Sequence, residues 1–371
     1  MYSVDLAFDR VLRRMGDPAE LRRYAYGGPY SATGLANHQL EYESMEGELE
    51  AIVDSDVIVF WGDFQHAHSF WRTGLRRRPG GTVEVADEHA ETARVAAHLL
   101  LDGQPDEVLA KTVSFGTCLL GDDVRAPSPA DATYRAAFQA FGARAHRIWC
   151  RDPISAAQVA RLRPDRDETC LGVDPALLLT PDDYRSLTSP PTRGEGHLAV
   201  FFGRLDASLT APGRLTAHLA RLAGLDAVWV PWLGPGGPPA DVLDAVPGLD
   251  ADAADSYEDL LSLVAGARLV VTDAYHLCLI AWRLGIPAIC VGVGAQRATR
   301  PVSDKKKEVF HLAQGLAPLY VFHETLAADE GHQPIARAVL DLALDPAYVG
   351  RATEAIATEA AAAEARLALA I

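Results

Sequence analysis

The chain is poor in lysine and cysteine, and it has no long hydrophobic run. Only four of its 34 basic residues are lysines, and three of these, Lys305, Lys306 and Lys307, are consecutive. The five cysteines are odd in number, scattered and without a CxxC motif, so we expect reduced thiols in a cytoplasmic protein. The N-terminus has no apolar core of a signal peptide. No stretch of about 20 uncharged apolar residues is present to span a membrane.

Several classes of function are disfavoured by the bulk properties. A chain of 371 residues exceeds one ordinary hydrophobic core and suits two domains. The formal net charge of −16 argues against non-specific nucleic-acid binding. No GxGxxG follows the first strand of either half, and no P-loop, HExxH or GxSxG motif is present. We therefore expect no cofactor and no nucleic-acid partner, while the oligomeric state stays open.

What the sequence does contain is an alternation of apolar runs and amphipathic segments, which predicts an α/β fold with parallel sheets. Residues 1–50 are predicted to be helical and polar, with a glycine-rich break at 26–30. A linker rich in proline, aspartate and serine at 180–196 divides the alternation. The predicted strands are 57–61, 111–115, 146–150, 170–173, 197–202, 227–231, 268–272, 288–291 and 319–322.

These patterns predict two Rossmann-like domains whose parallel sheets face a cleft. Residues 1–185 would form the N-terminal domain and residues 186–345 the C-terminal domain. Residues 346–371 form an alanine-rich helical tail that can cross back onto the first half.

One histidine stands between a predicted buried strand and a predicted buried helix. In the stretch VVTDAYHLCLIAWRLGIPAICVG, residues 270–292, an apolar strand ends near Thr272, and Thr272 or Asp273 can cap the helix that follows. His276 then lies in the first turn of this helix, at the carboxyl end of a strand, where open α/β sheets bind ligands. The alternative is a partly buried packing histidine.

Four segments, taken in order, resemble the polysaccharide pyruvyl transferase family. They are IWCRDPISAAQVARL (148–162), GVDPALLL (172–179), the 270–292 stretch and SDKKKEVF (303–310). The family pattern has an RD-x-x-S turn, a D-P-A segment, a D-R-x-H helix start leading to G-x-P, and then a lysine-containing loop. The resemblance covers roughly residues 50–325. It implies a GT-B-like architecture with the acceptor on the N-terminal side and the donor on the C-terminal side.

The resemblance also implies a reaction, in which a pyruvyl group moves from phosphoenolpyruvate onto two hydroxyls of a sugar to form a ketal. Asp273 and His276 match the Asp and His of D-R-x-H, and Arg151 matches the RD turn. Two departures stand out. The family arginine falls on Ala274, and Trp61 to Asp63 replaces a Gly-Gly pair after the first strand. The resemblance implies phosphoenolpyruvate or a related small anion as the donor, and the missing arginine means that phosphoenolpyruvate would need another cation.

The candidate donor residues each have a functional and a structural interpretation. His276 can act as the acid that protonates the enol methylene, or can donate a hydrogen bond to phosphate. Asp273 is carried over as a donor-side residue. Arg151 can grip a carboxylate or phosphate, or form a salt bridge to Asp152 or Asp174. Asp152 is better explained as the cap of its own helix.

Cations for the donor can also come from the lysine run and the loop before it. Lysines at a helix N-terminus oppose the helix dipole, so three in a lysine-poor chain suggest an anion site, with Lys305 or Lys306 in contact with the donor. The alternative is a solvated helix face. Arg297 and Arg300 could replace the cation missing at Ala274.

The loop GDFQHAHSFWR, residues 62–72, is the candidate acceptor site. Its aromatic residues together with Trp61, His66 and His68 can stack on a sugar, and Asp63 is a candidate base. The alternative is a packed aromatic cluster. Asp63 with the HxH pair could bind a metal, but the spacing places no further ligand, so we predict no metal there.

Two further functions remain open on the sequence. The first is a GT-B-type glycosyltransferase with a nucleotide sugar in the cleft, which the loss of the family arginine at Ala274 makes more credible. The second is a non-catalytic member of the family that binds a ligand without turnover. The three hypotheses differ in the ligand that they prefer and in whether they form a product.

Overall fold

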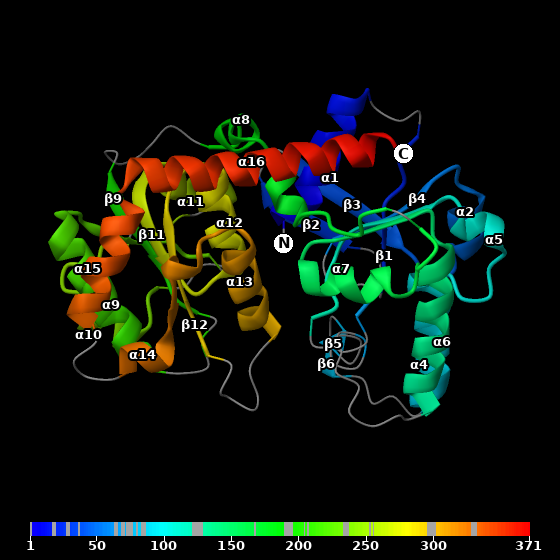
Figure 1. The fold of residues 1–371 in the computed structure, drawn as a ribbon, viewed down its shortest axis with the longest axis horizontal. Helices are drawn as coiled ribbons and strands as arrows, with labels where there is room; N and C mark the ends of the chain where they lie inside the picture. Colours follow the sequence, from blue (N-terminus) through cyan, green and yellow to red (C-terminus); the bar gives the residue numbers. More distant parts are fainter. Residues whose placement is uncertain are drawn as a thin grey trace. The chain divides into compact units, whose positions relative to one another are not determined.

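The computed structural model describes most of the chain, and the fold is drawn in Figure 1. The described residues are 2–16, 20–26, 30–35, 38–62, 66–67, 71, 77–78, 81–82, 87–120, 129–166, 168–188, 196–203, 205, 208–232, 237–251, 254, 256–294, 302–327 and 332–371.

The chain divides into two compact units. The first comprises Met1–Thr33, His38–Leu178 and Glu359–Ile371, and the second comprises Gly34–Asn37 and Leu179–Thr358. The division after Leu178 lies seven residues before the predicted boundary at 185. Of the predicted tail, residues 346–371, residues 359–371 belong to the first unit and residues 346–358 belong to the second.

Up to Leu178, the chain forms a central parallel sheet with helices around it. The order of this sheet is β4-β7-β8, and Phe60, Phe141 and Ile148 are among the residues of its core. The elements are α1 (Tyr2–Met15), β1 (Tyr24–Ala25), β2 (Tyr30–Leu35), β3 (His38–Ser44), α2 (Leu49–Asp54), β4 (Ile58–Trp61), β5 (Arg77–Arg78), β6 (Gly81–Thr82), α4 (Glu88–Leu99), α5 (Asp106–Leu109), β7 (Thr112–Thr117), α6 (Pro129–Arg144), β8 (Arg147–Cys150), α7 (Pro153–Ala160) and the 3₁₀ helix η1 (Pro175–Leu178).

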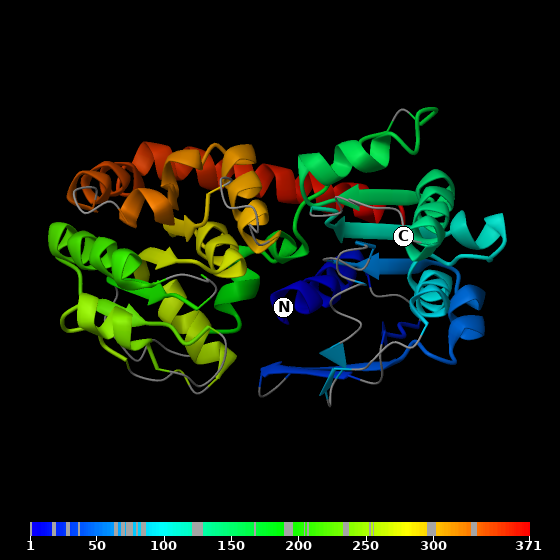
Figure 2. The same ribbon diagram turned by 90° about the horizontal axis from the view of Figure 1, so that it is seen from below.

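After Leu178, the chain forms a five-stranded parallel sheet in the order β10-β9-β11-β12-β13. Helices cover both faces of this sheet (Figures 1 and 2). The elements are α8 (Pro181–Arg185), β9 (His197–Phe201), α9 (Thr210–Ala223), β10 (Ala227–Trp229), α10 (Ala240–Ala245), α11 (Tyr257–Ala265), β11 (Ala267–Thr272), α12 (Tyr275–Arg283), β12 (Ala288–Gly292), α13 (Val302–Ala313), η2 (Ala317–Leu319), β13 (Tyr320–Phe322), α14 (His323–Ala327), α15 (His332–Ala343) and α16 (Pro346–Ala368).

The predicted α/β class with parallel sheets is confirmed, but two local predictions are wrong. Residues 1–50 are not all helical, because β1, β3 and β2 form a small sheet. In β3 the exposed Glu41 and Glu43 alternate with less exposed neighbours, which is the two-residue period of a strand. The predicted strand 170–173 is reduced to one parallel bridge between Leu171 and Cys150.

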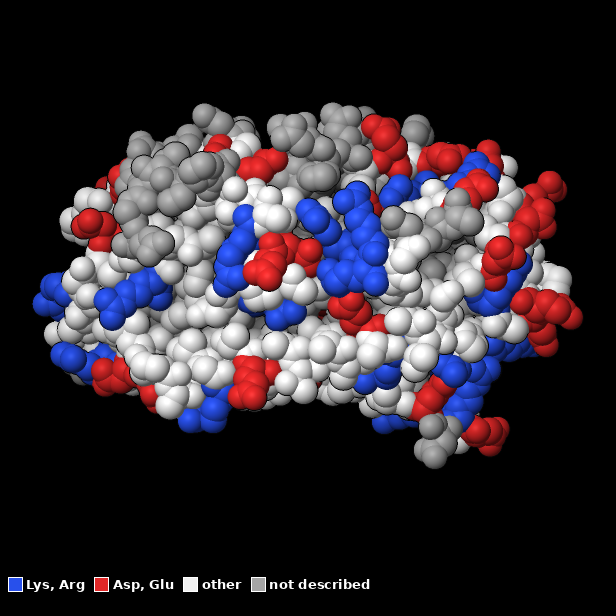
Figure 3. Space-filling view, turned by 90° about the horizontal axis from the view of Figure 1, so that it is seen from above, with Lys and Arg blue, Asp and Glu red and all other residues white. Residues whose placement is uncertain are grey.

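The described residues show no helix that combines the length and the apolar character needed to cross a membrane. Basic and acidic side chains are interspersed over the face drawn in Figure 3. Such mixing of the two signs is normal for a protein surface.

Candidate functional site

The second unit has a point where its strand order reverses. β9 comes first in this unit, β10 lies on one side of it, and β11 lies on the other side, followed outward by β12 and β13. Parallel sheets with this order bind ligands outside the carboxyl ends of the strands that flank the reversal, here β9 and β11. Residues 202–205 and 273–276 follow those two strand ends in the sequence.

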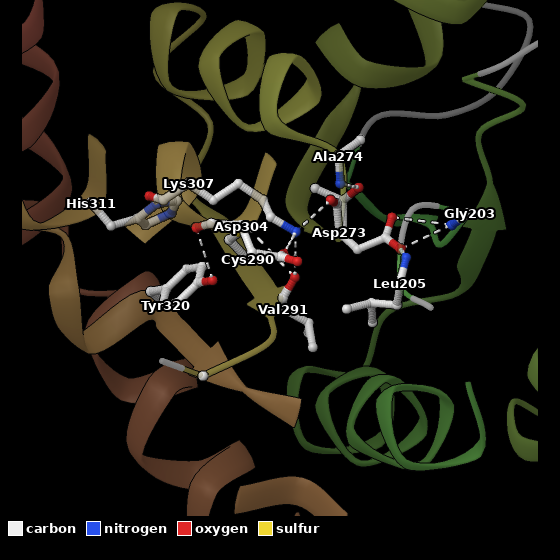
Figure 4. Close-up of polar contacts among 12 residues, drawn as sticks. Gly203, Leu205, Asp273, Ala274, Cys290, Val291, Asp304, Lys307, His311 and Tyr320 are labelled. Carbon is white, nitrogen blue, oxygen red and sulfur yellow. Dashed lines mark hydrogen bonds and ion pairs between the residues drawn. The ribbon is translucent and has the colours of Figure 1, made fainter. Parts of the chain in front are cut away.

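Asp273 joins the two strand ends. Its carboxylate accepts hydrogen bonds from the backbone N–H of Gly203 at 3.0 and 3.1 Å and of Leu205 at 2.7 Å (Figure 4). Thr272 pairs with Phe201 in the sheet, so the register brings Asp273 beside the loop after β9. The side chain is almost fully buried. Asp273 therefore holds the loop after β9 in place. Its contact with the donor stays a prediction.

The first turn of α12 has no side-chain cap. Ala274 is the N-cap residue, and the Thr272 hydroxyl accepts the N–H of Ala274 itself at 3.0 Å. The expectation that Thr272 or Asp273 caps this helix is therefore wrong, because the Asp273 carboxylate is directed to the loop after β9. A helix N-terminus carries partial positive charge and favours anions.

His276 lies where the sequence predicted, as the second residue of α12. Its ring is partly buried and meets the ring of Tyr275 edge-on, with centroids 5.1 Å apart. The helix positions this imidazole at the carboxyl end of β11, three residues after Asp273. From this position a histidine can donate a hydrogen bond or a proton to an anion at the helix N-terminus.

The lysine run lies in the second turn of α13, because the helix begins at Val302. Lys305 is partly exposed, whereas Lys306 and Lys307 are buried, so a solvated helix face does not describe these two. The Lys306 ammonium lies 5.1 Å from the centroid of the Tyr275 ring. Lys306 therefore brings a positive charge to the first turn of α12, next to the alanine that stands for the family arginine.

Lys307 forms a buried ion pair with Asp304, and both side chains are 1% exposed. Its ammonium also donates to the carbonyl oxygens of Asp273 at 3.0 Å and Val291 at 3.3 Å (Figure 4). Burial acts to lower the pKa of Lys307, but Cys290 and Asp304 act in the opposite direction, and the net shift is upward. Lys307 thus stays charged and ties α13 to the ends of β11 and β12.

Sequence reasoning missed the role of Lys307, which joins helix α13 to two strands. A signal was present, because Asp304 and Lys307 are three residues apart and face one another on a helix. The contacts of Gly203 and Leu205 had no comparable local signal, since Asp273 lies about 70 residues further along the chain.

In the first unit, Arg151 follows β8 and pairs with Asp174 at 3.1 Å, with side chains 2% and 1% exposed. The salt-bridge interpretation is confirmed with Asp174 as the partner. Asp152 caps α7, because its carboxylate accepts the Ser155 N–H at 2.8 Å and the Ser155 hydroxyl at 2.6 Å. The predicted cap is therefore confirmed. Binding of a donor by Arg151 stays a prediction.

Trp61 ends β4 and is fixed by contacts within the first unit. Its indole N–H donates to the Val4 carbonyl at 2.7 Å, and its ring stacks on Phe115 with centroids 5.0 Å apart. Gly62 follows with φ +79°, and a Cβ there would lie 2.7 Å from the Val4 side chain. A glycine is needed at this position for both reasons. Acceptor binding by Trp61 stays a prediction.

His66 is fully buried in the core of the first unit. Its Nε2 lies 3.0 Å from the Ser114 hydroxyl, and its ring packs against Phe60 and Phe141. This is the geometry of a packed aromatic cluster, which was the alternative interpretation, so we leave His66 out of the proposed acceptor contacts. Asp63, His68, Arg297 and Arg300 lie outside the described residues.

Lowering the pH should destabilise the fold through His66. Burial lowers the pKa of His66 from 6.5 to about 3. Below pH 6.5, His66 therefore takes up a proton in the unfolded chain but stays neutral in the folded chain. The contribution of neutral His66 to the free energy of unfolding is then fully present above pH 6.5 and is lost progressively toward pH 3. Between pH 7 and pH 5 the loss is about 2 kcal/mol. Denaturant unfolding at both pH values should show a smaller difference in His66→Gln, and an unchanged difference would contradict this assignment.

A titratable group that the sequence did not single out lies next to Val4. Burial raises the pKa of Asp5 to about 6, with a smaller opposing contribution from its hydrogen bond to Tyr42. A carboxyl with this pKa can take up and release protons near neutral pH. No sequence signal marks it, because its burial depends on packing within the folded unit.

Comparison with known proteins decides the family. The family described as polysaccharide pyruvyl transferase matches residues 98–294, which is more than half of the 371 residues. The chain belongs to the polysaccharide pyruvyl transferase family. As a family member it is a transferase, and the matched segment includes Arg151, Asp273 and His276. Lys305 and Lys306 follow the matched segment.

Several solved structures are distantly similar to this chain, with low identity and low TM-scores. CalG4, the calicheamicin glycosyltransferase, is 15% identical with a TM-score of 0.42, over 94% of this chain and 97% of that one. A UDP-forming α,α-trehalose-phosphate synthase from Burkholderia xenovorans is 13% identical with a TM-score of 0.44, over 98% and 95% of the two chains. UDP-GlcNAc 2-epimerase from Neisseria meningitidis is 12% identical with a TM-score of 0.38, over 73% and 80%. No curated protein matches the chain.

Proposed function

We propose that this protein transfers a pyruvyl group from phosphoenolpyruvate, or a related small anionic donor, onto hydroxyls of a sugar-like acceptor. The observation that carries the proposal is the position of His276. It lies in the first turn of α12 at the strand reversal of the second unit, within the segment that matches the family. A histidine, a helix N-terminus and a lysine are the groups that an anionic enol donor requires.

The chemistry assigns a separate task to each group. One acceptor hydroxyl forms a bond to C2 of the donor while the enol methylene takes up a proton, for which His276 is the proposed acid. The second hydroxyl then displaces phosphate from the same carbon and closes the ketal. A base accepts the hydroxyl protons, and cations hold the donor carboxylate and the leaving phosphate.

We infer that Lys306 supplies the positive charge that the family arginine would supply at Ala274. Ala274 is buried at the start of α12, and the Lys306 ammonium lies over the ring of the next residue, Tyr275. Lys305 is proposed as a second donor contact, because it lies on the same turn and is partly exposed. Arg297 remains a third candidate, together with the carried-over Arg151 and Asp273.

The acceptor is proposed to bind the first unit, at the carboxyl end of β4. Trp61 offers an aromatic ring there, with His68 in the loop that follows in the sequence. Asp63 is the proposed base. Asp5 is a second candidate, since its pKa of about 6 suits a group that must accept a proton near neutral pH.

Phosphoenolpyruvate should stabilise the purified protein against thermal unfolding. At about a hundred times its dissociation constant, a ligand that binds only the folded chain stabilises it by about 2.7 kcal/mol. Lys306→Ala should reduce the shift because it removes a cation from the donor site. Lys111→Ala is the matched control, since Lys111 is the one lysine outside the run. The same assay includes pyruvate, phosphate, and UDP-, GDP-, dTDP- and CMP-sugars.

A nucleotide-sugar glycosyltransferase is the second candidate function, and the observation that favours it is the alanine at position 274. A thermal shift with one nucleotide sugar, and none with phosphoenolpyruvate, would support it and overturn pyruvyl transfer. A shift with phosphoenolpyruvate that is never followed by product in the presence of any acceptor would indicate a member of the family that only binds.

A further inference from the structure

Two of the scattered cysteines meet a histidine in the core of the second unit. Cys278 lies on α12, Cys290 on β12 and His311 on α13. Their potential ligand atoms, two sulfurs and one ring nitrogen, all lie within 4.8 Å of one another. All three side chains are fully buried. Three elements thus place two sulfur atoms and one ring nitrogen close together, away from solvent.

The imidazole is oriented as a ligand. Its Nδ1 lies 2.7 Å from the Lys307 carbonyl oxygen, and because a carbonyl can only accept, Nδ1 carries the hydrogen. Nε2 therefore presents a lone pair, and it has no hydrogen-bond partner among the described residues. Metal-binding histidines are commonly held in this way, with the second nitrogen donating to a carbonyl.

A buried ammonium lies near the two sulfurs. The ammonium of Lys307 interacts electrostatically with Cys278 and Cys290, and Asp304 and two carbonyls hold it in place. Figure 4 shows Lys307, Cys290 and His311 in the same region of the second unit. A fixed cation stabilises negative sulfur in a buried site, where an isolated thiolate would be costly.

We propose that Cys278, Cys290 and His311 bind one thiophilic cation, Zn²⁺ or Cu⁺, as a structural site that fastens α13 to α12 and β12. Thiolate and imidazole donors select these cations over magnesium or calcium. Binding breaks two S–H bonds, forms two metal–sulfur bonds and one metal–nitrogen bond, and releases the two thiol protons without any change of oxidation state. Resting on the proposed function, the site would also fix the helix that carries Lys305 and Lys306.

Metal binding is tested on the full chain, purified under reducing conditions and stripped with a chelator. Zn²⁺ is added in competition with a chromophoric chelator, and Cu⁺ is added in competition with bathocuproine disulfonate. We expect one equivalent of one of the two ions per chain. Cys278→Ala should weaken binding by at least about 100-fold, since the loss of a hydrogen-bond partner that merely orients a ligand already costs about 10- to 100-fold. Cys170→Ala, a buried cysteine of the first unit, is the matched control and should bind normally.

A second measurement uses the unaltered chain, so that a folding defect in a variant does not decide the outcome. Co²⁺ in place of Zn²⁺ should give thiolate-to-metal charge-transfer bands with the intensity of two sulfur ligands. The proposal would be overturned by binding of less than about 0.1 equivalent of either ion, which is roughly a tenth of one site per chain. Normal binding by Cys278→Ala would also overturn it. So would a Cys278–Cys290 disulfide found by mass spectrometry in place of metal binding. None of these readouts depends on pyruvyl transfer, so the two proposals can fail separately.

Discussion

Replacing Lys307 with methionine should lower the free energy of unfolding by about 3–5 kcal/mol, because the buried Asp304 carboxylate loses the opposite charge of its ion pair. Asp304 would lose the charge of the Lys307 ammonium while its own side chain stays 1% exposed, and the carbonyls of Asp273 and Val291 would lose a donor. Methionine is close to lysine in length, so the effect comes mainly from charge and hydrogen bonding. Chemical denaturation at neutral pH gives the difference directly.

Two variants separate the buried ion pair from a general effect on α13. Lys305→Met changes a partly exposed lysine on the same turn and should alter stability by no more than about 0.5 kcal/mol. Combining Lys307→Met with Asp304→Asn removes both charges and should recover a large part of the loss. A double variant as unstable as Lys307→Met alone would show that the cost is one of packing.

Replacing His276 with alanine should lower the rate of pyruvyl transfer by about 10²- to 10⁴-fold, the usual contribution of a positioned acid or base. The fall should appear in kcat, with KM changed much less, if the imidazole acts on the proton of the transition state. The fold should persist, because His276 is only partly buried on the second position of α12. The measurement is steady-state transfer to an acceptor identified by product mass.

The control for His276 is His218→Ala, another partly buried histidine of the second unit, on α9 and outside the strand reversal. Its rate should match that of the unaltered chain. If His276→Ala transfers pyruvate at the full rate, His276 is a packing histidine and the acid lies elsewhere. If it loses thermal stability together with its rate, the loss is structural and the assignment of His276 as the acid fails.

Much of the fold was predictable because its strands are short buried apolar runs. The predicted strand 57–61 corresponds to β4 and 288–291 corresponds to β12, each within one residue. The failures come from interactions that the local pattern does not contain. β3 needs its partners in the small sheet, and residues 170–173 keep only one bridge to Cys150. Strand pairing is a long-range property, so local periodicity predicts it poorly.

The sequence by itself determined the α/β class, the order of the family segments and the place of His276 at the start of a helix. Each depends on residues that are near one another in the chain. Only the tertiary structure decided burial and partners. It placed His66 in the core, paired Arg151 with Asp174, and brought Cys278 and Cys290 to His311. Those contacts join separate elements, and packing between elements sets them, which no local spacing encodes.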